Sequence, residues 1–273
     1  MPTRNAYDPL PKREPTRGAP VMVHLRQPPV DAVIDWHRHT WGQLACPGEG
    51  SIRVSVPGAM WIVPRYRAVW IPAGIDHEVV MLGRVEFHAL YIELATSPLP
   101  RNGCSVIEVS PLMRELIHFL AMCDTAPDGQ RGYHAVGLLI EEMRAARALP
   151  LELPLPGERR LRALCRAMME DISSPRTLDE WAPVVGASAR TLARLFSTEL
   201  NTSFGVWRRQ LRLARAIDLI GRGVPLAGVA AEVGYANAPA FSTMFRQALG
   251  FPPSHLAGAG ATADESPRLD RQS

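Results

Sequence analysis

The sequence predicts an α+β chain of two domains: an N-terminal β-barrel followed by helices, and a C-terminal all-α domain built from tandem helix-turn-helix units. Three observations predict this fold class. Short segments rich in valine, isoleucine and aromatic residues recur between glycines and prolines from Val21 to Glu93. After Pro111 the apolar residues recur at helical spacing instead. A proline-rich stretch, 149–157, then precedes a long region of helical patterning.

The composition is typical of a soluble globular protein. The chain has 273 residues, of which 47% are hydrophobic and 21% charged. Its start has no apolar signal sequence, and no segment approaches the roughly 18 apolar residues of a membrane span. Four scattered cysteines form no Cys-x-x-Cys pair, as expected in a reducing compartment. We therefore expect a cytoplasmic protein without a membrane partner.

The N-terminal region is predicted to form strands. The tail 1–20 is rich in proline and arginine without periodicity, and we expect it and the tail 257–273 to be disordered. Within 21–100 the strand-like segments are short and evenly spaced, which is typical of a small barrel. The predicted strands are 21–25, 31–39, 42–45, 51–56, 59–63, 68–71, 78–82 and 86–93.

Two amphipathic helices are predicted in the segment 101–148. Leu112, Leu116 and Leu120 fall on one helical stripe, and a similar stripe runs through 136–143. We expect these helices to pack on the barrel or on a second copy of the chain, and to dimerise the protein.

The segment 149–157 is too rich in proline for a helix or a central strand, and we expect it to be a semi-rigid linker. The second domain, 158–256, follows it. Residues 157–256 contain 13 arginines and 8 acidic residues, a net charge of +5, whereas the remainder of the chain carries −2. This asymmetry favours a C-terminal domain that binds a polyanion.

The C-terminal domain contains an imperfect repeat. The pattern Ala-x-x-Val-Gly occurs at 182–186 and again at 230–234. In each copy a short helix is expected to meet a glycine with positive φ, and a second helix follows, which is the layout of a helix-turn-helix. A capping box at 177–180 begins the first copy, and Pro225 suits the first turn of the second. Pro183 is expected to kink the first short helix.

The two units are joined by a predicted helix over 204–220, which carries several arginines. A helix of this length can separate the two units by about 34 Å, the distance between successive major grooves on one face of DNA.

These motifs resemble the AraC/XylS family of bacterial transcription regulators. The segment 229–254 is similar to the family pattern Ile-Ala-x-x-Val-Gly-Tyr, then Phe-Ser-x-x-Phe-Arg, then Gly and Pro-Ser, and 187–196 resembles the first unit. The resemblance covers about a hundred residues. It implies a one-component regulator that binds double-stranded promoter DNA, contacts RNA polymerase and forms a homodimer.

For the first unit, the resemblance implies base-edge contacts by Arg190, Ala193 and Arg194. Arg190 and Arg194 are four residues apart and so share one helix face, where either can donate two hydrogen bonds to guanine. Arg209 and Arg246 are instead expected to contact phosphates, which position the protein without reading the sequence.

For the second unit, the resemblance implies contacts by Asn237, Pro239, Ala240 and Thr243. Asn237 either reads adenine or caps its helix. Pro239 and Ala240 stand where many family members carry polar groups, so we expect this unit to read thymine methyl groups or DNA shape.

A histidine pattern lies in the predicted barrel. His37 and His39 alternate along a strand and therefore share one face, Gln43 follows, and Pro72-Ala-Gly-Ile-Asp-His77 adds a third histidine. This spacing resembles the cupin barrel, whose motifs place these four positions around one metal, so the resemblance implies a cupin-like sensor. Gln43 replaces the acidic ligand of that family, and a neutral amide binds a divalent metal more weakly than a carboxylate.

Three interpretations of this histidine set remain open. The first is one divalent transition metal, Zn, Ni, Co, Cu or Fe, that is the effector or anchors it. The second is a metal-free pocket in which His37, His39, Gln43 and His77 bind a small-molecule effector. The third is a structural remnant of the fold.

We expect a non-enzymatic regulator whose DNA binding responds to an effector. The alternative is a cupin metal-dependent oxygenase or isomerase with a DNA-binding appendage, because three histidines with open metal positions can activate water or oxygen.

Overall fold

A computed structural model describes residues 6–7, 13–123, 129–149 and 151–257. The expectation of disordered tails therefore concerns mostly residues outside the described ranges. Of the N-terminal tail, Tyr7 donates its backbone N–H to the carbonyl of Val33 at 2.8 Å, so this residue pairs with the sheet.

The N-terminal half of the described chain forms a sheet of nine strands. These are β1 (Val21–Arg26), β2 (Val33–His37), β3 (Gly42–Val56), β4 (Ala59–Pro64), β5 (Arg67–Ile71), β6 (His77–Ile92), β7 (Ser105–Glu108), β8 (Ala148–Leu149) and β9 (Glu152–Pro154).

The long central strands β3 and β6 pair with different neighbours along their two halves, which divides the sheet into two parts that we call wings. One wing runs in the order β1-β6-β3-β5-β7-β8, and in the other β2 pairs with β6 while β4 pairs with β3 and β9. Buried side chains of both wings, such as Ile71 and Met81, belong to one apolar core. Among the described residues the sheet ends at β1 and β8 in one wing and at β2 and β9 in the other. The end strands do not pair with each other, so the sheet is not closed into the predicted barrel.

Two pairs of predicted strands are in fact single strands. The predicted strands 42–45 and 51–56 are both part of β3. The predicted strands 78–82 and 86–93 are both part of β6, which ends one residue earlier, at Ile92. Gly50 and Gly83 have φ of +76° and +79°, and the register of the β3–β6 ladder shifts around Glu49. The glycines therefore bend these strands without ending them.

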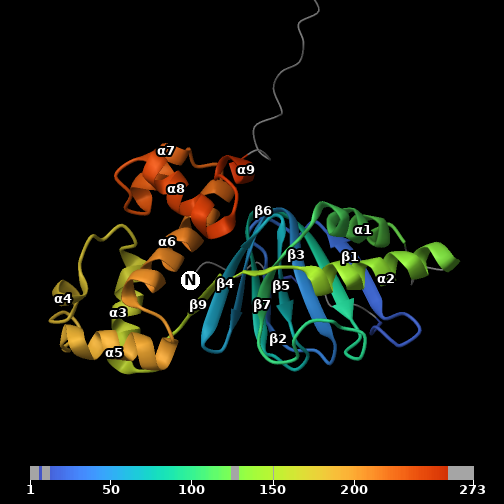
Figure 1. Ribbon diagram of the computed structural model, residues 1–273, viewed down its shortest axis with the longest axis horizontal. Helices are drawn as coiled ribbons and strands as arrows, with labels where there is room; N and C mark the ends of the chain where they lie inside the picture. The colour runs from blue at the N-terminus through green and yellow to red at the C-terminus, as the bar shows by residue number, and fades with distance from the viewer. Residues whose placement is uncertain (1–5, 8–12, 124–128, 150, 258–273) are drawn as a thin grey trace, which may run out of the picture.

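The two predicted helices are present as α1 (Pro111–Ala121) and α2 (Gly129–Ala145), and they cover one face of the sheet (Figure 1). Their buried residues, such as Met113 and Leu139, share a second apolar cluster with Leu44 and Leu90 of the sheet. The segment preceding α1, assigned to helices from the sequence, also contains strand β7, which pairs with β5.

The proline-rich segment 149–157 takes part in the sheet. β8 pairs with β7, and β9 pairs with β4 as an edge strand that ends at Pro154, where a missing N–H removes no ladder bond from a central strand. The linker is thereby attached to the N-terminal domain.

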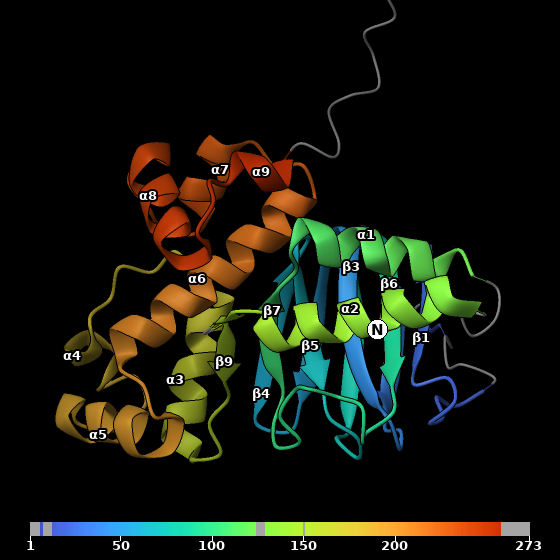
Figure 2. The same cartoon turned by 45° about the vertical axis from the view of Figure 1, so that its right-hand side comes forward.

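The C-terminal domain consists of helices among the described residues. They are α3 (Arg159–Glu170), α4 (Leu178–Trp181), α5 (Ala189–Leu200), α6 (Phe204–Gly221), α7 (Leu226–Glu232), α8 (Ala238–Leu249) and α9 (Ser254–Ala257). The long helix α6 lies against the sheet and joins α3, α4 and α5 to α7, α8 and α9 (Figures 1 and 2). No helix in these described ranges is long and apolar enough to cross a lipid bilayer.

The first short helix differs from its prediction at Pro183. Helix α4 ends at Trp181, so Pro183 follows the helix and does not kink it. In that position the missing N–H of proline costs no intrahelical hydrogen bond.

Candidate DNA-binding surface and histidine cluster

The first helix-turn-helix unit is formed by α4 and α5. Thr177 and Glu180 form the predicted capping box: the backbone N–H of Thr177 donates to the Glu180 carboxylate at 2.7 Å, and the Glu180 N–H donates to the Thr177 hydroxyl. Gly186 has φ +67°, as the turn requires. Leu192 and Phe196 are fully buried and hold α5 against the domain core.

The other face of α5 points to solvent. Arg190, Ala193 and Arg194 are all exposed. The helix therefore presents these three predicted contact residues together, with both guanidinium groups on one accessible surface.

The second unit is formed by α7 and α8. Gly234 joins the helices with φ +74°, and Phe241 and Phe245 are fully buried against the first helix and α6. Four predicted contact residues, Pro239, Ala240, Thr243 and Arg246, are exposed on α8.

Two polar side chains of α8 also have local roles. The Asn237 side-chain oxygen accepts the N–H of Ala240 at 2.9 Å and so caps the helix. The Thr243 hydroxyl donates to the carbonyl of Pro239 at 3.0 Å. Asn237 thus fulfils the capping role that the sequence left as one of two possibilities, and its side-chain amide group remains exposed.

Four exposed arginines form no ion pair with another described residue: Arg190, Arg194, Arg209 and Arg246. Other arginines of α6 are used inside the domain. Arg208 donates to the carbonyl of Arg176, and Arg212 donates to the carbonyls of 172–174. The unpaired arginines are therefore available to an external anion such as a DNA phosphate.

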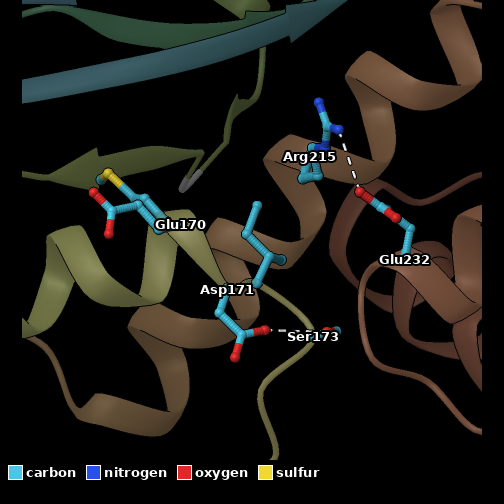
Figure 3. Close-up of a pocket in the computed structure, with 7 residues that line it drawn as sticks. Glu170, Asp171, Ser173, Arg215 and Glu232 are labelled. Atoms are coloured by element: carbon cyan, nitrogen blue, oxygen red, sulfur yellow. Dashed lines mark hydrogen bonds and ion pairs between the residues drawn. The ribbon is translucent and has the colours of Figure 1, made fainter.

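An open cavity of about 390 Å³ lies where α3 ends near α6 and α7 (Figure 3). Glu170, Asp171 and Glu232 line it beside Arg215, which pairs with Glu232 at 3.3 Å. This acidic lining is unsuited to a phosphate backbone, and it contains none of the predicted contact residues.

The structure brings the three predicted histidines together. His37 on β2 lies opposite His77 on β6, with ring centroids 4.2 Å apart, and the His39 and His77 rings are 5.0 Å apart. One ring nitrogen from each histidine lies within 4.8 Å of the others. The Gly74 N–H donates to the His39 carbonyl at 2.8 Å, which ties the two sequence motifs to each other.

The three imidazole rings share one feature: the Nδ1 atom of each faces a backbone carbonyl. Each Nδ1 lies 2.7–2.9 Å from a backbone carbonyl: Asp35 for His37, Trp41 for His39 and Ile75 for His77. An Nδ1–H donor leaves Nε2 with a free lone pair, the arrangement found in metal-ligating histidines. The sequence could not reveal these contacts, because any residue type supplies a backbone carbonyl.

Gln43 completes the cluster. It is 3% exposed, and its side-chain oxygen lies 2.9 Å from Nε2 of His39. When Nδ1 of His39 carries the proton and donates to the Trp41 carbonyl, Nε2 is an acceptor. It then faces the Gln43 oxygen, which is also an acceptor, unless the amide is turned to present its NH2 group. Two acceptors in contact are stabilised by a cation between them.

Burial keeps the rings of His39 and His77 neutral. Desolvation lowers the pKa of His77 to about 3 and also lowers the pKa of His39. The Nε2 atom of His77 is buried and has no hydrogen-bond partner among the described residues. A neutral imidazole with an unused lone pair is the form that binds a transition metal.

Comparison with known proteins places the chain in a family. A model of the helix-turn-helix domain matches residues 181–258. The HTH-type transcriptional regulator NimR of Escherichia coli K12 is 32% identical over 236 residues, which cover 86% of each chain. The HTH-type transcriptional activator RhaR of Pectobacterium atrosepticum is 32% identical over 254 residues, covering 86% of this chain and 89% of RhaR.

Among solved structures, ToxT from Vibrio cholerae aligns over 93% of this chain and all of its own, with 10% identity and a TM-score of 0.39. The assignment rests on the sequence relatives, which are transcription regulators as the sequence predicts. The chain belongs to the AraC family of helix-turn-helix transcriptional regulators.

Proposed function

We propose that this transcription regulator is controlled by a transition metal held at His37, His39, His77 and Gln43. The observation that carries the proposal is the feature that the three rings share, each being anchored at Nδ1 by a backbone carbonyl. This leaves three Nε2 atoms for one ion, with the Gln43 oxygen as the fourth ligand. Zn, Ni, Co, Cu and Fe all accept such a set.

A bound metal explains the cluster better than the other two interpretations. In a structural remnant, the buried Nε2 of His77 would be expected to have a protein partner, because a buried polar group without one is costly. A metal-free pocket for an organic effector requires the Gln43 amide to be turned, so that its NH2 group and not its oxygen faces Nε2 of His39. A cation accounts for both features.

On the DNA side, we propose that α5 and α8 enter successive major grooves of a promoter site. The exposed arginines of both units support this, since they form no ion pair within the described part of the protein. Dimerisation through α1 and α2, contact with RNA polymerase and action in the cytoplasm belong to the same proposal. The two-winged sheet would then serve as a cupin-like sensor, and metal binding would change the DNA affinity of the reading units.

Metal content of the purified protein tests the proposal. Inductively coupled plasma mass spectrometry is expected to find close to one equivalent of a transition metal in the wild type, and a loss in the variant His37→Ala/His77→Ala. His134 lies exposed on α2, so His134→Ala is a matched control and should retain the metal. A folded wild-type protein that takes up no added Zn, Ni, Co, Cu or Fe would overturn the metal proposal.

The regulatory step has its own readout. Fluorescence anisotropy with promoter DNA is expected to show different affinities for the metal-loaded protein and for protein treated with a chelator. Equal affinities would show that the metal does not regulate DNA binding and would argue for a purely structural metal.

A further inference from the structure

The sheet domain contacts both helix-turn-helix units. Beside the first unit, the indole N–H of Trp207 on α6 donates to the carbonyl of Pro154 at 2.8 Å. Leu153 of β9 belongs to the apolar core that Trp207 shares with Leu192 of the first unit. At the second unit, Ile62 of β4 and Leu82 of β6 pack into the core that contains Phe241. Side chains of the sheet therefore complete the core of each reading unit.

A buried polar contact across this boundary is made by Arg67, the first residue of β5. Arg67 is 3% exposed, and its Nη2 donates to the carbonyl of Leu249 at 2.8 Å. Its guanidinium group also lies over the Phe251 ring, 4.9 Å from the centroid. On the sheet side, Nη1 donates to the Tyr66 carbonyl at 2.7 Å and lies 3.4 Å from Glu108.

Leu249 is the last residue of α8, the second predicted recognition helix. The last carbonyls of a helix have no intrahelical partner and carry partial negative charge, so a guanidinium group is a suitable cap. Gly250 ends α8 within its own domain, with its N–H donating to the Arg246 carbonyl, and the other domain supplies a further cap at the Leu249 carbonyl through Arg67. The predicted reading residues lie toward the opposite end of the helix, from Asn237 onward, where they stay exposed.

We propose that Arg67 is a positioning residue for DNA recognition. By capping α8 from the sheet domain, it fixes the orientation of the second recognition helix relative to the first unit, which the sheet holds through the core that contains Trp207. With the sheet domain bound in this way the protein is ready to bind DNA. The contacts of the sheet domain lie at the carboxyl end of α8 and leave its amino end, which carries the predicted DNA contacts, free.

Strand β5 links this contact to the histidine cluster. Ile71, at the other end of β5, pairs with Gln43 of β3. A shift of Gln43 on ligand binding would thus be transmitted through one five-residue strand to the cap of α8. The inference rests on the proposed use of both units but does not require that the effector be a metal.

Arg67→Met tests the inference, because it keeps an unbranched aliphatic stem and removes the guanidinium donors. The probe is a duplex selected from random DNA by the wild-type protein, and a second duplex keeps only the half contacted by the first unit. Hydroxyl-radical footprinting of the wild type is expected to show two protected segments. Arg67→Met should lower affinity for the full duplex about tenfold, a typical coupling strength, without changing affinity for the half duplex.

Two further variants complete the experiment. Arg53 pairs with Glu78 inside the sheet domain, so Arg53→Met should leave both affinities unchanged. Phe251→Leu removes the ring under the guanidinium group from the other side of the boundary and should act like Arg67→Met, which keeps the test informative if Arg67→Met does not fold.

The outcomes are distinct. Wild-type affinity of Arg67→Met for the full duplex, or an equal loss for both duplexes, would overturn the positioning role. A single protected segment in the wild-type footprint would instead overturn the proposed reading by two units, and the inference with it.

Discussion

Gly234 lies directly against the backbone of Ser173: a Cβ atom at Gly234 would come within 2.6 Å of the Ser173 carbonyl oxygen. The glycine also has φ +74°. The turn of the second unit is therefore packed on the segment between α3 and α4, so the second unit contacts the chain that leads into the first unit, in addition to being joined to that unit by α6.

This contact predicts that Gly234→Ala destabilises the C-terminal domain more than Gly186→Ala. Gly186 also has positive φ, +67°, but a Cβ atom at this position would have no described neighbour within 4 Å. Alanine at Gly186 should cost about 1–2 kcal/mol from the left-handed backbone alone, and alanine at Gly234 should add a steric cost. Urea unfolding of both variants checks this, and equal losses would contradict it.

The same glycines show how much of the fold the sequence could predict. Positive φ was expected at both turns from the repeat, and both turns have it. Gly50 and Gly83 looked like strand ends, yet they lie inside β3 and β6, because a bulged ladder continues past a bend when its partner bends too. Local sequence cannot separate these cases, since pairing partners decide between them.

The candidate sites were predictable to different degrees. Alternation along a strand over 31–39 predicted that His37 and His39 share one face, but β2 ends at His37 and its register shifts between Ile34 and His37, so His39 lies beyond the strand. The two histidines nevertheless lie together, beside the His77 that the cupin resemblance added. The carbonyls that orient the rings and the cap that Arg67 donates to Leu249 were not predictable. Both involve backbone atoms, whose positions depend on the completed fold and not on residue type.

Acid should destabilise the sheet domain through His88. This residue on β6 is 4% exposed, and burial, followed by the charge of His118, lowers its pKa to about 4, although the Glu86 carboxylate lies 3.3 Å away. The unfolded chain binds that proton near pH 6.5. As the pH falls from about 6.5 to 4, the unfolded state gains protons first, so stability decreases, by at most about 3 kcal/mol.

Urea unfolding at pH 7 and pH 4.5 tests this dependence. His88→Leu should reduce the difference between the two pH values, whereas His134→Gln, at an exposed position on α2, should leave it unchanged. The same pH difference in His88→Leu as in the wild type would show that other groups cause the acid sensitivity.

The outer face of α1 and α2 should form the proposed dimer. Tyr133 and Leu138 on α2 are 77% and 44% exposed, and Leu112 on α1 is 45% exposed. Large apolar side chains on one helix pair favour contact with another protein surface. Tyr133→Glu/Leu138→Glu should therefore shift the protein from dimer to monomer in analytical ultracentrifugation, with little loss of helicity.

Glu141→Gln serves as a control for that experiment, because Glu141 is exposed on the same helix and contacts only Arg144 in its ion pair. It should sediment as the wild type does. A monomeric wild type, or a double variant that remains dimeric, would contradict dimerisation through this face.

Arg194 should contact a base and Arg209 a phosphate, so substitutions at the two positions should have different effects on DNA binding. Arg194 projects from α5 beside Arg190, whereas Arg209 lies on the linking helix α6, and both are exposed. Arg194→Ala should cost about 1–3 kcal/mol on the selected site and relax preference at one base pair, because a lost bidentate contact removes discrimination. Arg209→Ala should weaken selected and random DNA alike and lower the salt dependence.

Anisotropy titrations of both variants on selected and random duplexes, at two salt concentrations, measure these effects. Arg166 is exposed on α3 and pairs with Glu170, so Arg166→Ala controls for the loss of one positive charge far from the recognition helices in sequence. If Arg194→Ala weakened both duplexes equally, as Arg209→Ala is expected to do, Arg194 would be a phosphate contact and base reading by the first unit would have to rest on Arg190.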